Sequence, residues 1–142
     1  MSLNLQTARI ILAAALSTGH EKQYKPLTVV VLDAGGHLLA AEREDGASMG
    51  RFDIAYGKAR GALALGLGSR ALMIRAEQQP YFIAAATAAT GGSLVPVPGG
   101  VLIRDHADQL LGAVGVSGDT SDNDEDAAVA GIEAASLLAQ AD

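Results

Sequence analysis

A glycine-rich turn between two short apolar runs constrains the fold more than any other feature of the sequence. The turn is Asp33–Gly36, and it separates the β-branched run Leu27–Leu32 from the run His37–Ala41. An Asp at the first position of a turn accepts backbone hydrogen bonds, and glycines adopt the positive φ values that tight turns need. The two runs are therefore predicted to be the strands of a β-hairpin.

A second hairpin is predicted further along the chain. The runs Val101–Arg104 and Leu110–Val116 are apolar, and the polar segment Asp105–Gln109 joins them. Before them lies Leu94–Pro98, whose two prolines cannot donate backbone hydrogen bonds. This segment is therefore limited to a sheet edge or to the start of a strand.

Helical periodicity occurs before the first hairpin and between the two hairpins. Apolar residues recur every three or four positions in residues 5–19, 48–64 and 69–89. Ser48 is a candidate N-cap of the second segment. Pro80 divides the third segment into two short helices, because proline lacks a backbone donor and crowds the preceding turn.

Ser121 or Asp122 is predicted to cap a last helix, whose acidic first turn suits the positive end of the helix dipole. Its buried face is expected to include Ile132 and Leu138. Hairpins kept apart from helices predict an α+β fold, with helices packed on the faces of an antiparallel sheet. Because no linker or internal repeat divides the chain, residues 1–142 are expected to form one domain.

The composition excludes several classes of protein. With 49% hydrophobic and 18% charged residues, the chain has enough apolar surface to fold. A net charge of -6 gives no electrostatic reason to bind nucleic acid or an anionic membrane, and no apolar run is long enough to span a bilayer. The absence of cysteine excludes disulfides and thiolate chemistry, and a cytoplasmic location is expected.

Charged residues around the first hairpin and the following helix are candidate site residues. Arg43, together with Asp45, could clamp a carboxylate through its guanidinium. Asp33 could act as a general base, although its place in the turn favours a local hydrogen-bonding role. Lys58 lies on or beside an apolar helix face, where acid/base work is one alternative. We expect Lys58 instead to form an ion pair with Asp33 or Asp53.

Several short segments together resemble the GlcG/HbpS-like family of haem-binding or haem-degrading domains, which also forms the C-terminal domain of the cobalamin adenosyltransferase PduO. The match runs nearly end to end. Each segment alone is weak, and their order makes the resemblance specific. The segments are Val30–Leu38, Arg43–Ala47, Asp53–Ala55 with Lys58–Arg60, Pro98–Val101 with Ile103, and Gly112–Gly118, followed by Asp124 and, seven residues later, Gly131.

The resemblance implies a profilin-like sheet of about five antiparallel strands covered by helices. It implies a homo-oligomer, a dimer or larger, with a pocket near the subunit contacts. It also favours a ligand at Pro98, Gly99 and Gly100, where residues without side chains would let backbone N–H groups approach an anion or a planar ring. A β-bulge or bend is the alternative explanation of the glycine pair.

Haem is the cofactor candidate that the resemblance implies, and it needs one axial ligand in an apolar slot. His37 is the candidate axial ligand, because it alone among the histidines lies in a family-like segment. A solvent-facing strand residue is the simpler expectation for it. The other histidines are His20 and His106. No two of the three histidines have the spacing of metal ligands, so no metal cluster is predicted.

Three functions stay open. The first is a small-molecule-binding homo-oligomer that holds haem, or another planar or carboxylate ligand, between Pro98–Gly100, Arg43 and Lys58. The second is a cofactor-free enzyme acting on a small oxo- or hydroxy-acid, with Asp33, Lys58 or Asp53 as acid or base. In this enzyme, Arg43 would clamp the anionic group of the substrate. The third is an accessory or assembly subunit without a ligand.

Overall fold

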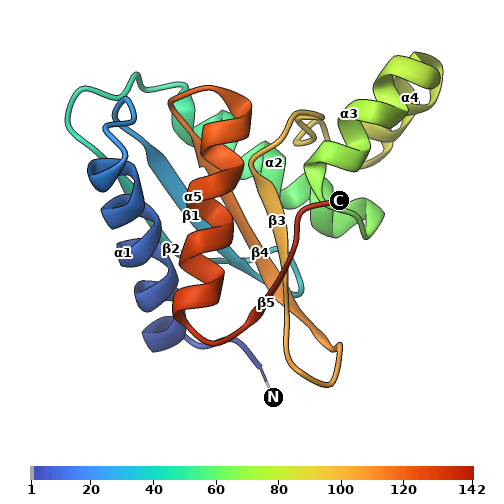
Figure 1. Ribbon diagram of the computed structural model, residues 1–142. Helices are drawn as coiled ribbons and strands as arrows, with labels where there is room; N and C mark the ends of the chain where they lie inside the picture. The colour runs from blue at the N-terminus through green and yellow to red at the C-terminus, as the bar shows by residue number, and fades with distance from the viewer. Residues whose placement is uncertain (1) are drawn as a thin grey trace.

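The computed structural model describes residues 2–142, which form five helices and five strands (Figure 1). None of these helices is long and apolar enough to cross a membrane. The helices are α1 (Leu5–Glu21), α2 (Arg51–Leu65), α3 (Ser69–Gln78), α4 (Pro80–Ala89) and α5 (Ser121–Ala134). The strands are β1 (Thr28–Asp33), β2 (Leu38–Arg43), β3 (Gly100–Arg104), β4 (Leu110–Ser117) and β5 (Leu138–Gln140).

All five strands form one antiparallel sheet in the order β2-β1-β4-β3-β5. Both predicted hairpins are confirmed, because β1 pairs with β2 and β3 pairs with β4. Strand β1 also pairs with β4, which joins the two hairpins at the centre of the sheet. This arrangement confirms the predicted α+β class and agrees with the profilin-like sheet that the resemblance implies.

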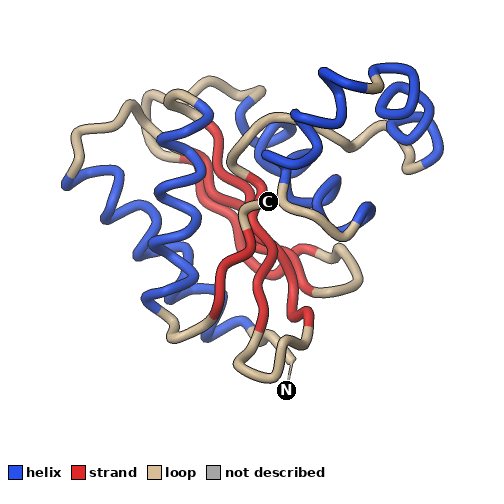
Figure 2. Tube along the Cα trace, turned by 45° about the vertical axis from the view of Figure 1, so that its right-hand side comes forward, coloured by secondary structure: helices blue, strands red, loops and turns tan. Residues whose placement is uncertain are grey.

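Helices α1 and α5 cover one face of the sheet, and α2 covers the other (Figures 1 and 2). Side chains along β1 alternate between these layers. Val29 and Val31 pack in the core that includes α1 and α5, whereas Val30 and Leu32 pack in the core that includes α2. Because both faces of the strand are buried, Val29–Leu32 is apolar without interruption.

Helices α3 and α4 form an arm that projects from the sheet and its covering helices (Figures 1 and 2). Pro80 is the first residue of α4, which confirms the predicted division of this segment. The arm is held by its own small apolar cluster, which includes Leu72, Ile83 and Leu94.

Three predicted details of the helices are wrong. The N-cap of α2 is Gly50 and not Ser48, because a turn in which the Arg51 N–H donates to the Ser48 carbonyl precedes the helix. The N-cap of α5 is Thr120, whose hydroxyl accepts from the Asn123 N–H at 3.2 Å. Leu138 lies in β5 and not on the buried face of α5.

Strand β5 was not predicted from the sequence. Helix α5 ends at Ala134, and Ser136 then takes a φ of 60°, which turns the chain back toward β3. Leu138 pairs with Arg104 of β3 and is 45% exposed. Neither glycine nor proline marks this turn, so the helical spacing of the apolar residues was misleading.

Candidate functional site

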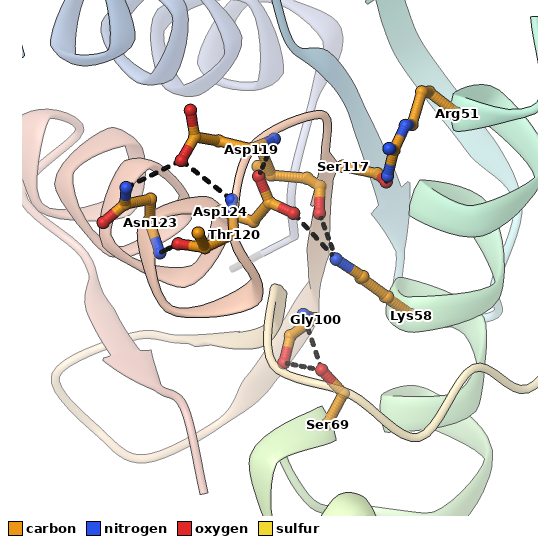
Figure 3. Close-up of polar contacts among 10 residues, drawn as sticks. Arg51, Lys58, Ser69, Gly100, Ser117, Asp119, Thr120, Asn123 and Asp124 are labelled. Carbon is orange, nitrogen blue, oxygen red and sulfur yellow. Dashed lines mark hydrogen bonds and ion pairs between the residues drawn. The ribbon is translucent and has the colours of Figure 1, made fainter. Parts of the chain in front are cut away.

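Lys58 of α2 is a buried charged side chain, only 2% exposed. Its ammonium donates to the carbonyl oxygen of Val116 in β4 at 2.9 Å and to Oδ2 of Asp124 in α5 at 3.0 Å. Figure 3 shows the side chain of Lys58 reaching from α2 to Asp124. Lys58 is therefore in an ion pair, but its partner is Asp124, and the predicted partners Asp33 and Asp53 are wrong.

Burial dominates the protonation of this pair. Desolvation lowers the pKa of Lys58, and the neighbouring Asp124 carboxylate opposes that shift. Desolvation raises the pKa of Asp124, while Lys58 and the N–H of Asp119 favour its charged form. Each charge thus depends on the other, and the pair cross-links α2, β4 and α5 in the protein interior.

Gly99 and Gly100 let the chain pass directly beside Lys58. A Cβ on Gly100 would lie 2.2 Å from the carbonyl oxygen of Lys58, and Gly99 has a φ of +125°. The Gly100 N–H donates to Oγ of Ser69 at 2.7 Å, and the Gly99 carbonyl accepts from the N–H of Val116 at 2.9 Å. Close packing and internal hydrogen bonds therefore account for both glycines, and ligand binding at Pro98, Gly99 and Gly100 stays a prediction.

Asp33 and His37 lie together in the first hairpin turn. Oδ1 of Asp33 accepts from the N–H groups of Gly35 and His37, at 2.9 and 3.0 Å, and these bonds lower the pKa of the carboxyl group. This is the local turn role that the sequence favours. The His37 side chain is 83% exposed, with Nδ1 lying 3.3 Å from the same Asp33 oxygen.

The other predicted site residues are spread around the molecule. Arg43 ends the edge strand β2 and donates to the Ala47 carbonyl at 2.7 Å. Asp45 lies in the following loop, where both residues line a depression of about 480 Å³. Asp53 is exposed in the first turn of α2. The structure thus brings Lys58 to the glycine pair, and Arg43 to Asp45, but does not join these two groups by any hydrogen bond or ion pair among the described residues.

The largest of the described depressions is a groove of about 760 Å³ between α1 and the edge strand β2. We call it the α1–β2 groove. Its apolar lining includes Leu12, Leu16 and Leu39, and its polar lining includes Arg9 and His20. The volume is within the range of small-molecule sites.

His20 stands where the α1–β2 groove meets the depression beside Arg43, since it lines both. Its Nε2 lies 2.6 Å from Oε2 of Glu44, and the other Glu44 oxygen accepts from the N–H of Leu27 at 2.8 Å. The carboxylate is thus fixed by the backbone and fixes the imidazole in turn. A carboxylate on one ring nitrogen is the arrangement that orients histidines whose other nitrogen binds a metal.

Two residues of these sites were missed as site candidates. Asp124 had a signal in the sequence, because it belongs to the segments that resemble the family. His20 had none, because nothing in the spacing shows that the end of α1 meets the loop after β2. In the part of the chain that the structure describes, no three His, Asp or Glu side chains gather closely enough to hold a metal ion.

Comparisons with solved structures find the same fold. The crystal structure of a PduOC–haem complex matches with a TM-score of 0.85 and 24% identity, covering 96% of this chain and 97% of that chain. The Klebsiella pneumoniae protein ORFY matches with a TM-score of 0.83 and 27% identity, covering 94% of this chain and 90% of that chain. A double mutant of Streptomyces reticuli HbpS matches with a TM-score of 0.80 and 26% identity, covering 94% of this chain and 86% of that chain.

Comparison with curated proteins finds no match. A family model described as "Haem degrading protein HbpS-like" matches residues 3–133, which is most of the chain. This match agrees with the segments quoted from the sequence and with the antiparallel sheet and its covering helices. The chain belongs to the HbpS-like family.

Proposed function

We propose that the protein binds haem in the α1–β2 groove. The observation that carries this proposal is the lining of the groove, which combines apolar side chains with one histidine and one arginine. Membership of a family described by haem degradation and the fold shared with a haem-bound PduOC support the choice of ligand. A carboxylate-bearing planar molecule of similar size is the wider class to which such a groove would be suited.

The residues present fit haem chemically. His20 can supply an axial nitrogen, because Nδ1 has no hydrogen-bond partner among the described residues while Nε2 is held by Glu44. Arg9 lies on the same helix, about 16 Å from His20 along its axis. Its guanidinium is suited to a propionate carboxylate. The leucines between them would cover the ring.

Haem titration followed by the Soret band tests this proposal. The wild-type protein is expected to shift and sharpen the band with a saturable 1:1 stoichiometry. His20→Ala is expected to abolish the axial-ligand spectrum, and Glu44→Gln to weaken binding about tenfold, because a carboxylate behind a ligating histidine raises its basicity.

The controls are His37→Ala and His106→Ala, which replace exposed histidines outside the α1–β2 groove. Both are expected to bind like the wild type. If His37→Ala removed the axial-ligand spectrum while His20→Ala kept it, the axial ligand would be His37, the candidate named from the sequence, and the proposal that haem binds in the α1–β2 groove would be wrong.

We also propose that the protein is a homo-oligomer and that α4 contributes to the contact. Helix α4 carries no charged residue, yet Tyr81 is 70% exposed and four of its alanines are exposed. An antiparallel pair of α4 helices would place each Tyr81 over the small alanines at the far end of its partner. Such a surface is complementary to itself, which a two-fold contact requires.

Ala85→Glu tests the contact, because Ala85 lies on the exposed side of α4. Light scattering during size-exclusion chromatography is expected to show an oligomer for the wild type and a monomer for Ala85→Glu. Ala107→Glu places the same charge in an exposed turn away from the arm and is expected to leave the mass unchanged. A wild-type monomer, or an oligomeric Ala85→Glu variant, would refute the role of α4.

The other two hypotheses, a cofactor-free enzyme and an accessory subunit without a ligand, have less support. An acid or base must reach its substrate, and Lys58 is enclosed by β4 and α5. Asp33 is engaged by the turn backbone. A ligand-free accessory role predicts that haem titration gives no saturable spectral change, so the same experiment decides between it and haem binding.

A further inference from the structure

Glu44, which follows β2, is held by the backbone on both sides of the loop. Its N–H donates to the carbonyl oxygen of Leu27 at 3.0 Å, and its carbonyl oxygen accepts from the N–H of Ala47 at 3.1 Å. In the side chain, Oε1 accepts from the N–H of Leu27 at 2.8 Å. Because Leu27 and Ala47 are buried, these bonds fix where the second carboxylate oxygen, Oε2, lies.

That second oxygen lies 2.6 Å from Nε2 of His20. The Glu44 side chain is 16% exposed, whereas the His20 side chain is 76% exposed. An ionised carboxylate can only accept, so the proton of a neutral imidazole belongs on Nε2. The lone pair is then on Nδ1, which is the nitrogen proposed above to bind iron.

The surroundings of His20 are negative. The residue lies in the last turn of α1, at the negative end of the helix dipole. Three carboxylates, those of Glu42, Glu44 and Asp45, line the depression that His20 shares, and Arg43 is the one fully charged base there. Of these carboxylates, Glu44 is the one in contact with the imidazole.

A negative charge behind an axial histidine acts differently on the two oxidation states of haem iron. Ferric iron carries one more positive charge than ferrous iron, so a nearby carboxylate stabilises the ferric state more. Partly buried charges are screened less by salt than exposed ones, which favours a measurable effect of Glu44. Groups that contact a metal ligand are among the means by which proteins set a reduction potential.

We propose that Glu44 makes the α1–β2 groove selective for ferric over ferrous haem by acting through His20. This inference rests on the proposal that haem binds in the groove with His20 as its axial ligand. Glu44 is then a positioning residue, because its contact is with the imidazole. Its effect is a lower reduction potential of the bound haem.

A reductive titration of the haem-loaded full chain, followed by the Soret band, tests this inference. Dithionite supplies the electrons, and each electron converts one ferric iron to ferrous iron. Glu44→Gln is expected to weaken the binding of ferric haem about tenfold and to leave the binding of ferrous haem nearly unchanged. By thermodynamic linkage, such a change raises the midpoint potential of the bound haem by about 59 mV.

The midpoint potential separates an electrostatic role of Glu44 from a purely structural one. If the carboxylate only held the ring in place, Glu44→Gln would weaken ferric and ferrous binding equally, and the potential would not change. Glutamine has the same shape as glutamate and keeps one oxygen that can accept from the N–H of Leu27. Circular dichroism is therefore expected to show an unchanged fold.

Asp45→Asn is the matched control. It removes one carboxylate from the same depression, but Asp45 is exposed and has no contact with His20 among the described residues. It is expected to change the ratio of ferric to ferrous binding less than twofold, which corresponds to less than about 18 mV. An equal shift in Asp45→Asn and Glu44→Gln would mean that the contact with His20 has no special part, and it would overturn the inference.

His20→Ala distinguishes the failure of this inference from the failure of the haem site. If His20→Ala removed the axial-ligand spectrum while Glu44→Gln left the midpoint potential unchanged, haem would bind at His20 and only the role of Glu44 would be wrong. If neither variant changed the spectrum or the potential, haem would bind elsewhere, and both proposals would be wrong.

Discussion

Asp124→Leu is expected to destabilise the protein by about 3–5 kcal/mol, because it leaves the ammonium of Lys58 buried without its counter-charge. Leu has the same number of side-chain heavy atoms as Asp in the same branched arrangement, so few packing contacts are lost. The Asp119 N–H would also lose its acceptor. Urea unfolding followed by circular dichroism measures the change as a lower midpoint with an unchanged slope.

The double variant Lys58→Met/Asp124→Leu is the matched control. Removing both charges of a buried pair is often neutral or stabilising, so the double variant is expected to recover most of the stability that Asp124→Leu loses. The two residues would not act as a pair if Asp124→Leu alone left the free energy of unfolding nearly unchanged. The same would follow if the loss in the double variant equalled the sum of the losses in Lys58→Met and Asp124→Leu. Lys58 would then be available for another role.

Gly100→Ala is expected to destabilise the protein by about 3 kcal/mol, which is the upper part of the usual cost of overpacking. The new Cβ would lie 2.2 Å from the backbone carbonyl oxygen of Lys58, so α2 or β3 must move. Thermal and urea unfolding measure the loss.

Gly50→Ala is the control for this substitution, because a Cβ at Gly50 would meet no other atom within 4 Å and its φ is -70°. It is expected to change the free energy of unfolding by less than about 0.5 kcal/mol. A Gly100→Ala variant as stable as Gly50→Ala would show that close packing does not explain the glycine pair. Ligand binding at this pair would then be the better explanation.

Local chemistry made the hairpins predictable. The turn at Asp33–Gly36 is encoded by one carboxylate and two glycines, and each acts within a few residues. The division of the arm at Pro80 is equally local, because one residue removes one backbone donor. Strand β5 was missed because its pairing with β3 is a tertiary interaction, and no typical turn residue before the strand indicates it.

The candidate sites could be predicted only in part, because their residues meet through the fold. Lys58 was expected in an ion pair from its place on an apolar helix face, but Asp124 lies 66 residues further along the chain.

The explanation of the glycine pair differs most between the sequence and the structure. In the sequence, Gly99 and Gly100 are open to two explanations: a bound ligand, which the family resemblance favours, or a β-bulge or bend. In the structure, that backbone is covered by Lys58 and hydrogen-bonded to Ser69 and Val116. The α1–β2 groove lies on the other side of the sheet, and His20, which lines it, is the axial ligand that we propose for haem.

Paramagnetic broadening by ferric haem in amide-resolved NMR spectra tests the central claim most directly, because broadening depends on distance from the iron. The account predicts that signals of residues 9–20 and 39–44 broaden first and most strongly, centred on His20. Broadening centred on His37, or on Pro98–Gly100 and Lys58, would contradict it and place the ligand at one of the candidate sites named from the sequence.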